Sequence, residues 1–349
     1  MKNKWYIILI PIVILIVGIV LILNKQDIDL PVATESSPVD IMIGFSVDSM
    51  VIERWKKDVN ILKSNAEALG YRVEVTNSFE NAEKQNKQIV SLVDAGAKVI
   101  FIIPTDKDAL GDSITYAKKH QVIVIAYDRM INNANVDAYV SFDNVLVGEY
   151  LAEALIEKVP KGNYVIINGA PTDLNSYMFN EGYHNILKPY IEIGDIQIIH
   201  ESWADGWREE LAYERVNQLL EDGNQIDAII GANDLLAEGI ISALSEHGLA
   251  GKIPVVGHDA EVSACQRIVE DKQLMTVYKP ISVLADGAMT IAEKLMRGEP
   301  LVYTETINDG TYEVPYIKFK VISVNKDNMK ETVIKDLFHL EEDIYRNVE

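Results

Sequence analysis

The feature that most constrains the fold is a regular alternation of short apolar runs with amphipathic segments, which begins near residue 41. Ten runs of five to seven mostly apolar residues are predicted to be strands: 41–47, 71–76, 98–103, 122–127, 138–142, 163–168, 196–201, 227–232, 253–258 and 275–279. Helical segments such as 53–70 and 281–298 alternate with them. Apolar strands separated by helices form parallel sheets that are covered on both faces. The sequence therefore predicts a doubly wound α/β architecture.

The length of the chain indicates two such lobes, because 349 residues exceed the usual size of one domain. About ten strands are also too many for one lobe of this size. We expect the chain to cross between lobes at Asp143–Asn144, at Lys279–Pro280 and around Asn308–Gly310. The expected N-terminal lobe comprises residues 40–144 plus 280–308, and the expected C-terminal lobe comprises residues 145–279 plus 309–349.

The N-terminus carries a long apolar run from Trp5 to Leu23, preceded by Lys2 and Lys4. As a helix, about 19 residues would span roughly 28 Å, which approaches the thickness of a bilayer core. We predict a transmembrane signal-anchor over residues 1–24 with a cytoplasmic N-terminus, followed by a linker over 25–39. The alternative is a cleaved leader with a cut near residues 32–34. No cysteine follows the run, which excludes a lipoprotein anchor.

Composition and motifs exclude several classes of function. The net charge of -21 disfavours binding to nucleic acid. The single cysteine, Cys265, rules out an internal disulfide, and six scattered histidines show no metal-ligand spacing. The chain contains no P-loop, G-x-G-x-x-G, G-x-S-x-G or H-E-x-x-H motif. We therefore expect no metal, no cofactor and no catalytic residue.

Polar residues follow many of the predicted strands at their carboxyl ends: Asp48, Asp128–Arg129, Asp143–Asn144, Asp173 with Asn175, Asn233–Asp234 and Asp259. Ligands of open α/β sheets bind outside the carboxyl ends of the strands. Any one of these residues could instead be the N-cap of the next helix. Their recurrence predicts a polar cleft between two facing lobes.

The chemistry of this cleft suits a polyol. Carboxylates accept hydrogen bonds, arginine donates them in a rigid fork and amides do both, so together they match sugar hydroxyls. An aromatic ring would cover the C–H face of the sugar, and Trp207 and Trp55 are the candidates. Trp55 lies in a helical segment, where packing in the core is an equal alternative.

Residues from about 40 to 340 resemble the D-xylose-binding proteins of the type I, ribose-binding-like, periplasmic binding protein family. The matching stretches are 53–58 (ERWKKD), 126–132 (AYDRMIN), 141–144 (SFDN), 168–175 (NGAPTDLN), 203–207 (WADGW), 233–234 (ND), 257–260 (GHDA), 275–280 (MTVYKP) and 333–339 (VIKDLFH). The resemblance implies two lobes with a multi-strand hinge and closure on a sugar. His258 and Leu174 depart from the family pattern, where glutamine and asparagine stand.

By this resemblance, Arg54, Asp128 and Arg129 would bind the sugar from the first lobe. The second lobe would contribute Asp173, Asn175, Trp207, Asn233 and Asp259, and Lys279 would bind from the hinge. The cations would donate to ring and anomeric oxygens, the carboxylates and amides would hold the hydroxyls, and Trp207 would stack on the ring.

The expected function is an extracytoplasmic, single-pass membrane receptor for D-xylose. The retained apolar helix resembles membrane-anchored xylose-binding proteins that partner a LytS-type sensor histidine kinase. The alternative partner is a sugar ABC permease, and the alternative class is a glycosidase that uses the paired carboxylates. A sugar-responsive repressor is rejected because the N-terminus holds an apolar span where a basic DNA-binding motif would be needed.

Overall fold

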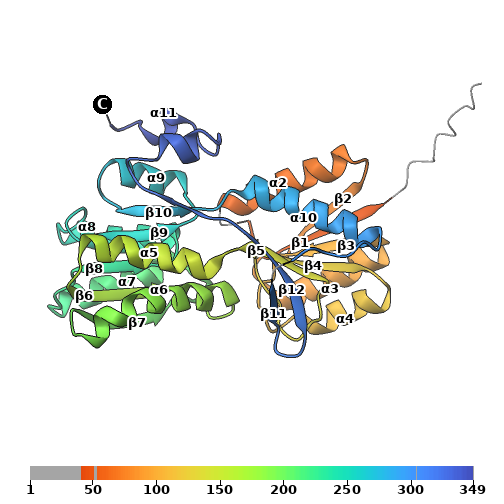
Figure 1. The fold of residues 1–349 in the computed structure, drawn as a ribbon, viewed down its shortest axis with the longest axis horizontal. Coiled ribbons are helices and arrows are strands. Elements are labelled where there is room, and N and C mark those ends of the chain that lie inside the picture. The colour runs from red at the N-terminus through yellow and green to blue at the C-terminus, as the bar shows by residue number, and fades with distance from the viewer. Residues whose placement is uncertain (1–40, 51–52, 304, 349) are drawn as a thin grey trace, which may run out of the picture. The chain divides into compact units, whose positions relative to one another are not determined.

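A computed structural model describes residues 41–50, 53–303 and 305–348. The predicted signal-anchor over 1–24 and linker over 25–39 lie outside these described residues. Within the described residues, no helix combines the length and apolar character needed to cross a membrane. Residues from Ile41 onward form one compact unit, in which two α/β lobes can be distinguished (Figure 1).

The first lobe is built on a seven-stranded sheet in the order β11-β12-β5-β4-β3-β1-β2. All neighbouring strands are parallel except β11, which runs antiparallel to β12. The strands are β1 (Met42–Val47), β2 (Arg72–Asn77), β3 (Ala97–Ile102), β4 (Ile123–Tyr127), β5 (Ala138–Phe142), β11 (Glu305–Asn308) and β12 (Glu313–Phe319). Its helices are α2 (Glu53–Ala68), α3 (Ala82–Asp94), α4 (Gly111–Lys119) and α10 (Ile281–Met296).

The second lobe is built on a six-stranded sheet in the order β13-β10-β9-β8-β6-β7, in which only β13 is antiparallel to its neighbour. The strands are β6 (Gly162–Asn168), β7 (Ile196–Trp203), β8 (Ala228–Gly231), β9 (Val255–His258), β10 (Met275–Tyr278) and β13 (Ile322–Val324). Its helices are α5 (Asn144–Lys158), α6 (Leu174–Glu192), α7 (Glu209–Glu221), α8 (Asp234–Glu246), α9 (Val262–Val269) and α11 (Glu341–Ile344). Two short turns, a 3₁₀ turn at Asp205–Trp207 and a π turn at Lys330–Ile334, complete it.

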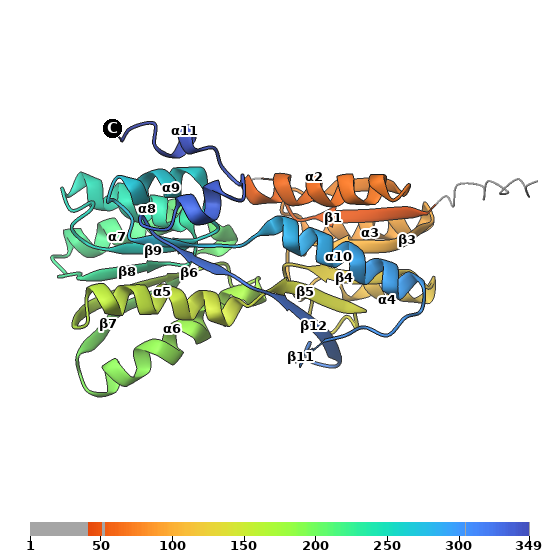
Figure 2. The same cartoon turned by 45° about the horizontal axis from the view of Figure 1, so that its top comes forward.

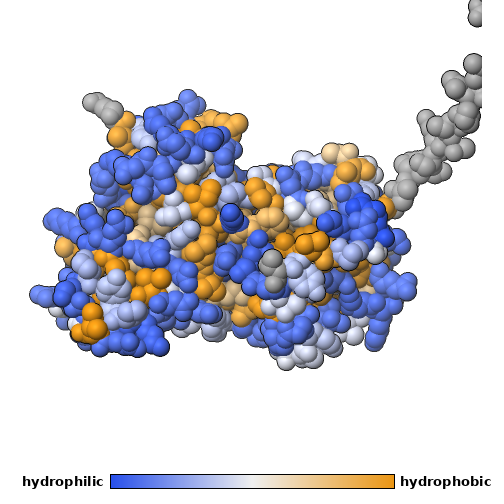
Figure 3. Space-filling view, viewed as in Figure 1, coloured by the Kyte–Doolittle hydropathy of each residue, from blue (hydrophilic) through white to orange (hydrophobic). Residues whose placement is uncertain are grey.

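Helices cover both faces of each sheet, as the continuous apolar strands require. In the first lobe, α2 packs with α10 and α3 packs with α4; in the second, α5 packs with α6 and α7 with α8 (Figures 1 and 2). Every residue of β1, β5, β8, β9 and β10 is buried. Hydrophilic residues dominate the face of the molecule that Figure 3 presents. Apolar side chains thus form the interior of both lobes.

The chain passes between the lobes three times. The first two passages, from β5 to α5 at residues 142–144 and from β10 to α10 at residues 278–281, lie where the sequence places them. The third runs from β12 to β13 at residues 320–321. We expected it around Asn308–Gly310, but these residues form the turn between β11 and β12, both in the first sheet. Residues 309–319, which we expected in the C-terminal lobe, therefore belong to the first lobe.

Candidate functional site

The carboxyl ends of the two sheets face a common small cavity between the lobes. All ten predicted site residues line it: Arg54, Trp55, Asp128, Arg129, Asp173, Asn175, Trp207, Asn233, Asp259 and Lys279. Two further residues, Phe179 and His258, complete the wall.

The first lobe contributes an arginine–carboxylate network. Arg54 lies in the first turn of α2, and Asp128 follows β4 with a backbone φ of 63°. Arg54 Nη2 donates to Asp128 Oδ2 at 2.8 Å, and Arg54 Nε donates to the buried Asp58 at 3.3 Å. Tyr127 donates to the other Asp58 oxygen at 2.6 Å. Because Asp58 and Asp128 hold the guanidinium from two sides, Arg54 has a fixed orientation toward the cavity.

Arg129 links the two lobes. Its Nη1 donates to Asp48 of the first lobe at 2.8 Å, and its Nε lies 2.7 Å from Asp173 Oδ2 of the second lobe. Asp173 is also the N-cap of α6, where its Oδ1 accepts from the backbone N–H of Asn175 at 2.9 Å. Asp173 therefore both caps α6 and lines the cavity.

Asn175 and Asn233 occupy similar places at helix N-termini. Asn175 Nδ2 donates to the backbone carbonyl of Asp128 at 3.0 Å, and its Oδ1 accepts from Tyr139 at 2.8 Å. These contacts cross from the second lobe to the first. Asn233 caps α8 by accepting from Leu236 N–H at 2.9 Å, and its side chain still lines the cavity.

Asp259 of the second lobe lies against three basic side chains. It follows β9 with a φ of 99°. Its Oδ1 lies 3.4 Å from Arg54 Nη1, 3.5 Å from Lys279 Nζ and 3.6 Å from His258 Nε2. Because Arg54 belongs to the first lobe, this carboxylate also joins the two halves of the site.

Burial and neighbouring charges fix the protonation states of these groups. Burial alone would raise the pKa of Asp259, but the cations of Lys279 and Arg54 outweigh it and hold that pKa below its usual range. Burial disfavours the imidazolium form of His258 and lowers its pKa to about 3. His258 is therefore neutral at neutral pH. Its Nδ1 faces the carbonyl of Ala232, which only accepts, so Nε2 carries the lone pair.

Aromatic side chains form the apolar part of the wall. Trp207 ends the 3₁₀ turn after β7 with a φ of 58°, and its ring meets Phe179 edge-on at 6.4 Å between centroids. Trp55 stacks under Arg54, whose Cζ lies 4.4 Å from the ring. Both indole N–H groups are buried without a hydrogen-bond partner. Buried unpaired donors are rare, and both of these belong to residues that line the cavity.

The charges that line the cavity balance. Its three cations, Arg54, Arg129 and Lys279, match three carboxylates, Asp128, Asp173 and Asp259. A neutral ligand with many hydroxyl groups meets both donors and acceptors here. The described residues contain no group of three histidine, cysteine or acidic side chains arranged to hold a metal ion.

Fold and site together define a two-lobed ligand-binding protein of the type I periplasmic binding architecture. The chain belongs to the periplasmic binding protein family, whose domain model matches residues 43–300. It is 42% identical over 306 residues to the D-xylose-binding periplasmic protein of Escherichia coli K12, a match that covers 87% of this chain and 93% of the relative. It is 41% identical over 307 residues to the D-xylose-binding periplasmic protein of Haemophilus influenzae, covering 88% and 92%.

A solved structure agrees with this fold. An ABC transporter solute-binding protein from Clostridium phytofermentans, with bound β-D-glucose, superimposes with a TM-score of 0.80 at 26% identity. The match covers 87% of this chain and 99% of that one. The whole two-lobed unit is therefore shared, not one lobe alone.

Proposed function

We propose that this chain is a D-xylose receptor that works outside the cytoplasmic membrane and delivers the sugar to an ABC permease. The observation that carries the proposal is its 41–42% identity to two D-xylose-binding periplasmic proteins over more than nine tenths of their length. The balanced polar cavity supports it, because a pentose presents hydroxyls that donate and accept on a small ring.

In the proposed complex, Arg54, Arg129 and Lys279 donate to sugar oxygens. Asp128, Asp173 and Asp259, together with Asn175 and Asn233, hold the hydroxyls, and Trp207 with Trp55 covers the ring and offers its N–H groups. His258 adds an acceptor at Nε2 that differs from the glutamine of the family pattern. Binding brings the lobes together, because residues of both lobes contact one ligand.

The proposal is tested by calorimetry on the full-length protein in a detergent without a sugar headgroup. We expect D-xylose to bind with one site per chain, and more tightly than D-ribose, L-arabinose or D-glucose. Glucose is the critical comparison, because the superimposed solute-binding protein holds it. Tighter binding of a hexose, or no binding of xylose, would refute the assignment of the ligand.

A sensor histidine kinase is the second candidate partner. It is favoured by the apolar run from Trp5 to Leu23 with no cysteine after it, which suits a receptor that stays in the membrane. A tethered receptor stays near one resident partner at high effective concentration. Co-purification from native membranes with a permease supports the main proposal, and co-purification with a kinase supports this alternative.

Glycoside hydrolysis is disfavoured by the pairing of the carboxylates. Asp173 lies against Arg129, and Asp259 lies against Arg54 and Lys279. A glycosidase needs one carboxylic acid that donates a proton to the leaving group. The pKa of Asp259 is held below its usual range, and Asp173, whose pKa burial raises, has both oxygens already paired, with Arg129 and with the N–H of Asn175. Incubation with aryl xylosides should therefore release no phenol.

A further inference from the structure

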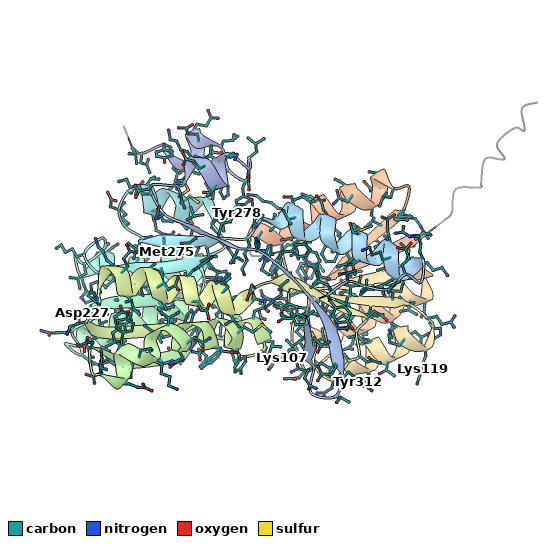
Figure 4. All side chains as sticks on the ribbon, viewed as in Figure 1. Lys107, Lys119, Asp227, Met275, Tyr278 and Tyr312 are labelled. Carbon is teal, nitrogen blue, oxygen red and sulfur yellow. The ribbon has the colours of Figure 1, made fainter. Side chains whose placement is uncertain are left out.

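The C-terminal tail after β13 is anchored to the second lobe. Met329, Val333 and Ile344 are buried in one apolar cluster with Tyr278 of β10 and Cys265 of α9. The side chain of Gln266 in α9 donates to the carbonyl of Asp343 at 2.7 Å. Figure 4 labels Tyr278 below the tail. The tail, residues 325–348, therefore moves with the second lobe.

One segment of this tail, Phe338–His339, reaches the first lobe. Lys57 of α2 donates through Nζ to the carbonyl of Phe338 at 3.0 Å. The same ammonium lies 4.0 Å from the centroid of the Phe338 ring and 3.4 Å from His339 Nδ1. Lys57 is one helical turn after Arg54, and Figure 2 shows the tail beside the start of α2. The segment thus connects the lobes next to the cavity.

The other side of His339 faces the turn at Asp259–Ala260. His339 is buried, and its Nε2 lies 2.7 Å from the carbonyl of Ala260, the residue after Asp259. A carbonyl only accepts and an ammonium only donates, so Nε2 carries the proton and Nδ1 accepts from Lys57. Asp259 and Ala260 both have positive φ, at 99° and 52°. Positive φ is a strained conformation for residues other than glycine, and it persists only when contacts with surrounding residues stabilise it.

We propose that Phe338–His339 is an interlobe latch that positions Asp259 and stabilises the closed arrangement of the lobes. The proposal rests on the proposed sugar-binding function. Neither Phe338 nor His339 lines the cavity, so the latch acts on the site through other residues. Phe338 contacts α2 through Lys57, and His339 contacts the residue after Asp259 through the carbonyl of Ala260. Contacts that exist only when the lobes are together increase the population of the closed form. They raise the apparent ligand affinity by the factor by which that population increases.

The test uses full-length variants in a detergent without a sugar headgroup, with xylose binding followed by calorimetry and stopped-flow. We expect K57M and H339A each to weaken xylose binding about tenfold, chiefly through faster dissociation. The double variant should lose less than the product of the two single losses, because both act through one contact. H339Q keeps a donor for the Ala260 carbonyl and should stay within about threefold of the unaltered protein. K56M, which changes the exposed neighbouring lysine, is the matched control and should bind normally.

A second readout does not depend on xylose. Spin labels on cysteines at Lys87 and Lys188, exposed positions in different lobes, report the distance between lobes, and the buried Cys265 stays unlabelled. We expect K57M and H339A to shift the sugar-free distance distribution toward longer values. Unchanged affinity, dissociation rate and distances in both variants, with only a lower melting temperature, would overturn the latch. If the unaltered protein binds no xylose, the proposed ligand fails, and the distance measurement still decides the latch.

Discussion

At the residue scale, Trp55 and Trp207 both line the cavity, and their indole N–H groups are buried donors. An unpaired buried donor costs about 1–3 kcal/mol, and in the described structure neither group has a partner. A sugar hydroxyl between the lobes would supply one. The ring of Trp207 is 6% exposed, so its area is already withdrawn from water before any ligand contact.

Replacing Trp207 should weaken binding and, because this side chain belongs to the buried core, should also lower the stability of the second lobe. We expect W207A to lose about 1–3 kcal/mol of xylose affinity, as for other anchoring aromatic side chains. Calorimetry measures the loss. W203A is the control, because Trp203 lies on the same segment but is 37% exposed and packs against Tyr177 outside the cavity. Equal affinities of W207A and the unaltered protein would remove Trp207 from the site.

Replacing Asp259 should weaken xylose binding at least as much as replacing Trp207. In D259A, Arg54 and Lys279 would lose a shared buried partner, and breaking a buried ion pair from one side costs about 3–5 kcal/mol. We expect a loss of xylose binding of at least tenfold and a lower melting temperature. D205A, which removes an exposed carboxylate near Trp207, should change neither quantity. A D259A protein that binds xylose normally would exclude this carboxylate from the site.

Residue identities at strand ends predicted much of the polar lining of this cavity, whereas Arg54 and Lys279 were identified only through the family resemblance. Parallel strands present their carboxyl ends at one edge, so residues such as Asp128 and Asn233 are placed by the topology alone. Phe179 was missed because it lies inside a helix. It follows Asn175 by one helical turn on the same side of α6, and that spacing is the signal that could have identified it. The neutral state of His258 depends on its burial, which no spacing reveals.

At the element scale, the position of α6 depends on two glycines. A Cβ on Gly182 would lie 2.1 Å from the carbonyl oxygen of Val145 in α5, and one on Gly148 would lie 2.1 Å from that of Phe179. The two helices therefore approach with backbone against backbone. Because Asn175 and Phe179 belong to α6, the same contact sets where these side chains enter the cavity.

Adding one methyl group at this contact should separate the helices. We expect G182A to lower the free energy of unfolding by about 1–3 kcal/mol, the usual cost of overpacking, and to weaken xylose binding. G111A is the matched control: its Cβ would meet only Asn133 O, at 3.9 Å, and it should be neutral or stabilising by up to about 1 kcal/mol. Denaturant unfolding of both variants measures the difference. A G182A protein as stable as the unaltered one would contradict the close approach.

A second contact of α6 should make stability depend on pH. His184 Nε2 lies 3.4 Å from Glu201 of β7, which also accepts from Asn168 at 2.9 Å. The hydrogen bond from His184 lowers the pKa of Glu201 to about 2, and the same bond raises the pKa of His184. The Glu201 contribution is present above about pH 4.5 and is lost as the pH falls toward 2. The His184 contribution is present below about pH 6.5 and is lost as the pH rises through its raised pKa.

The pair is therefore most stabilising between about pH 4.5 and 6.5. E201Q should lower the free energy of unfolding by up to about 1 kcal/mol at pH 5.5 and by less at pH 9, since both side chains are partly exposed and screened. Urea unfolding at the two pH values measures this. A loss that is equal at both, or larger at pH 9, would contradict the assignment.

The elements also show where sequence reasoning stops. The ten apolar runs correspond to β1 to β10 because buried parallel strands are continuously apolar. The last three strands were missed. β11 alternates half-buried with exposed residues at the sheet edge, and β13 is only three residues long. Without them, the third passage between lobes could not be placed, since the Asn308–Gly310 turn was the strongest turn signal in that region.

At the scale of the whole described unit, the lobes are joined by three passages and by polar contacts across the cavity. Arg129 with Asp173, and Arg54 with Asp259, each pair one residue from either lobe. A ligand held between them should stabilise both lobes together. At a xylose concentration one hundred times the Kd, the free energy of unfolding should rise by about 2.7 kcal/mol in a single transition. Calorimetric scans that show two transitions, only one of which shifts, would contradict this coupling.

The interleaving of the lobes along the chain bears on how the protein is made. The first sheet lacks β12 until residue 319 has been synthesised, and the second lacks β13 until residue 324. Neither half can complete its hydrogen-bonded framework while the ribosome is still translating the preceding nine tenths of the message. Loss of the residues after 312 would therefore leave both lobes incomplete at once, instead of one finished lobe and one missing lobe.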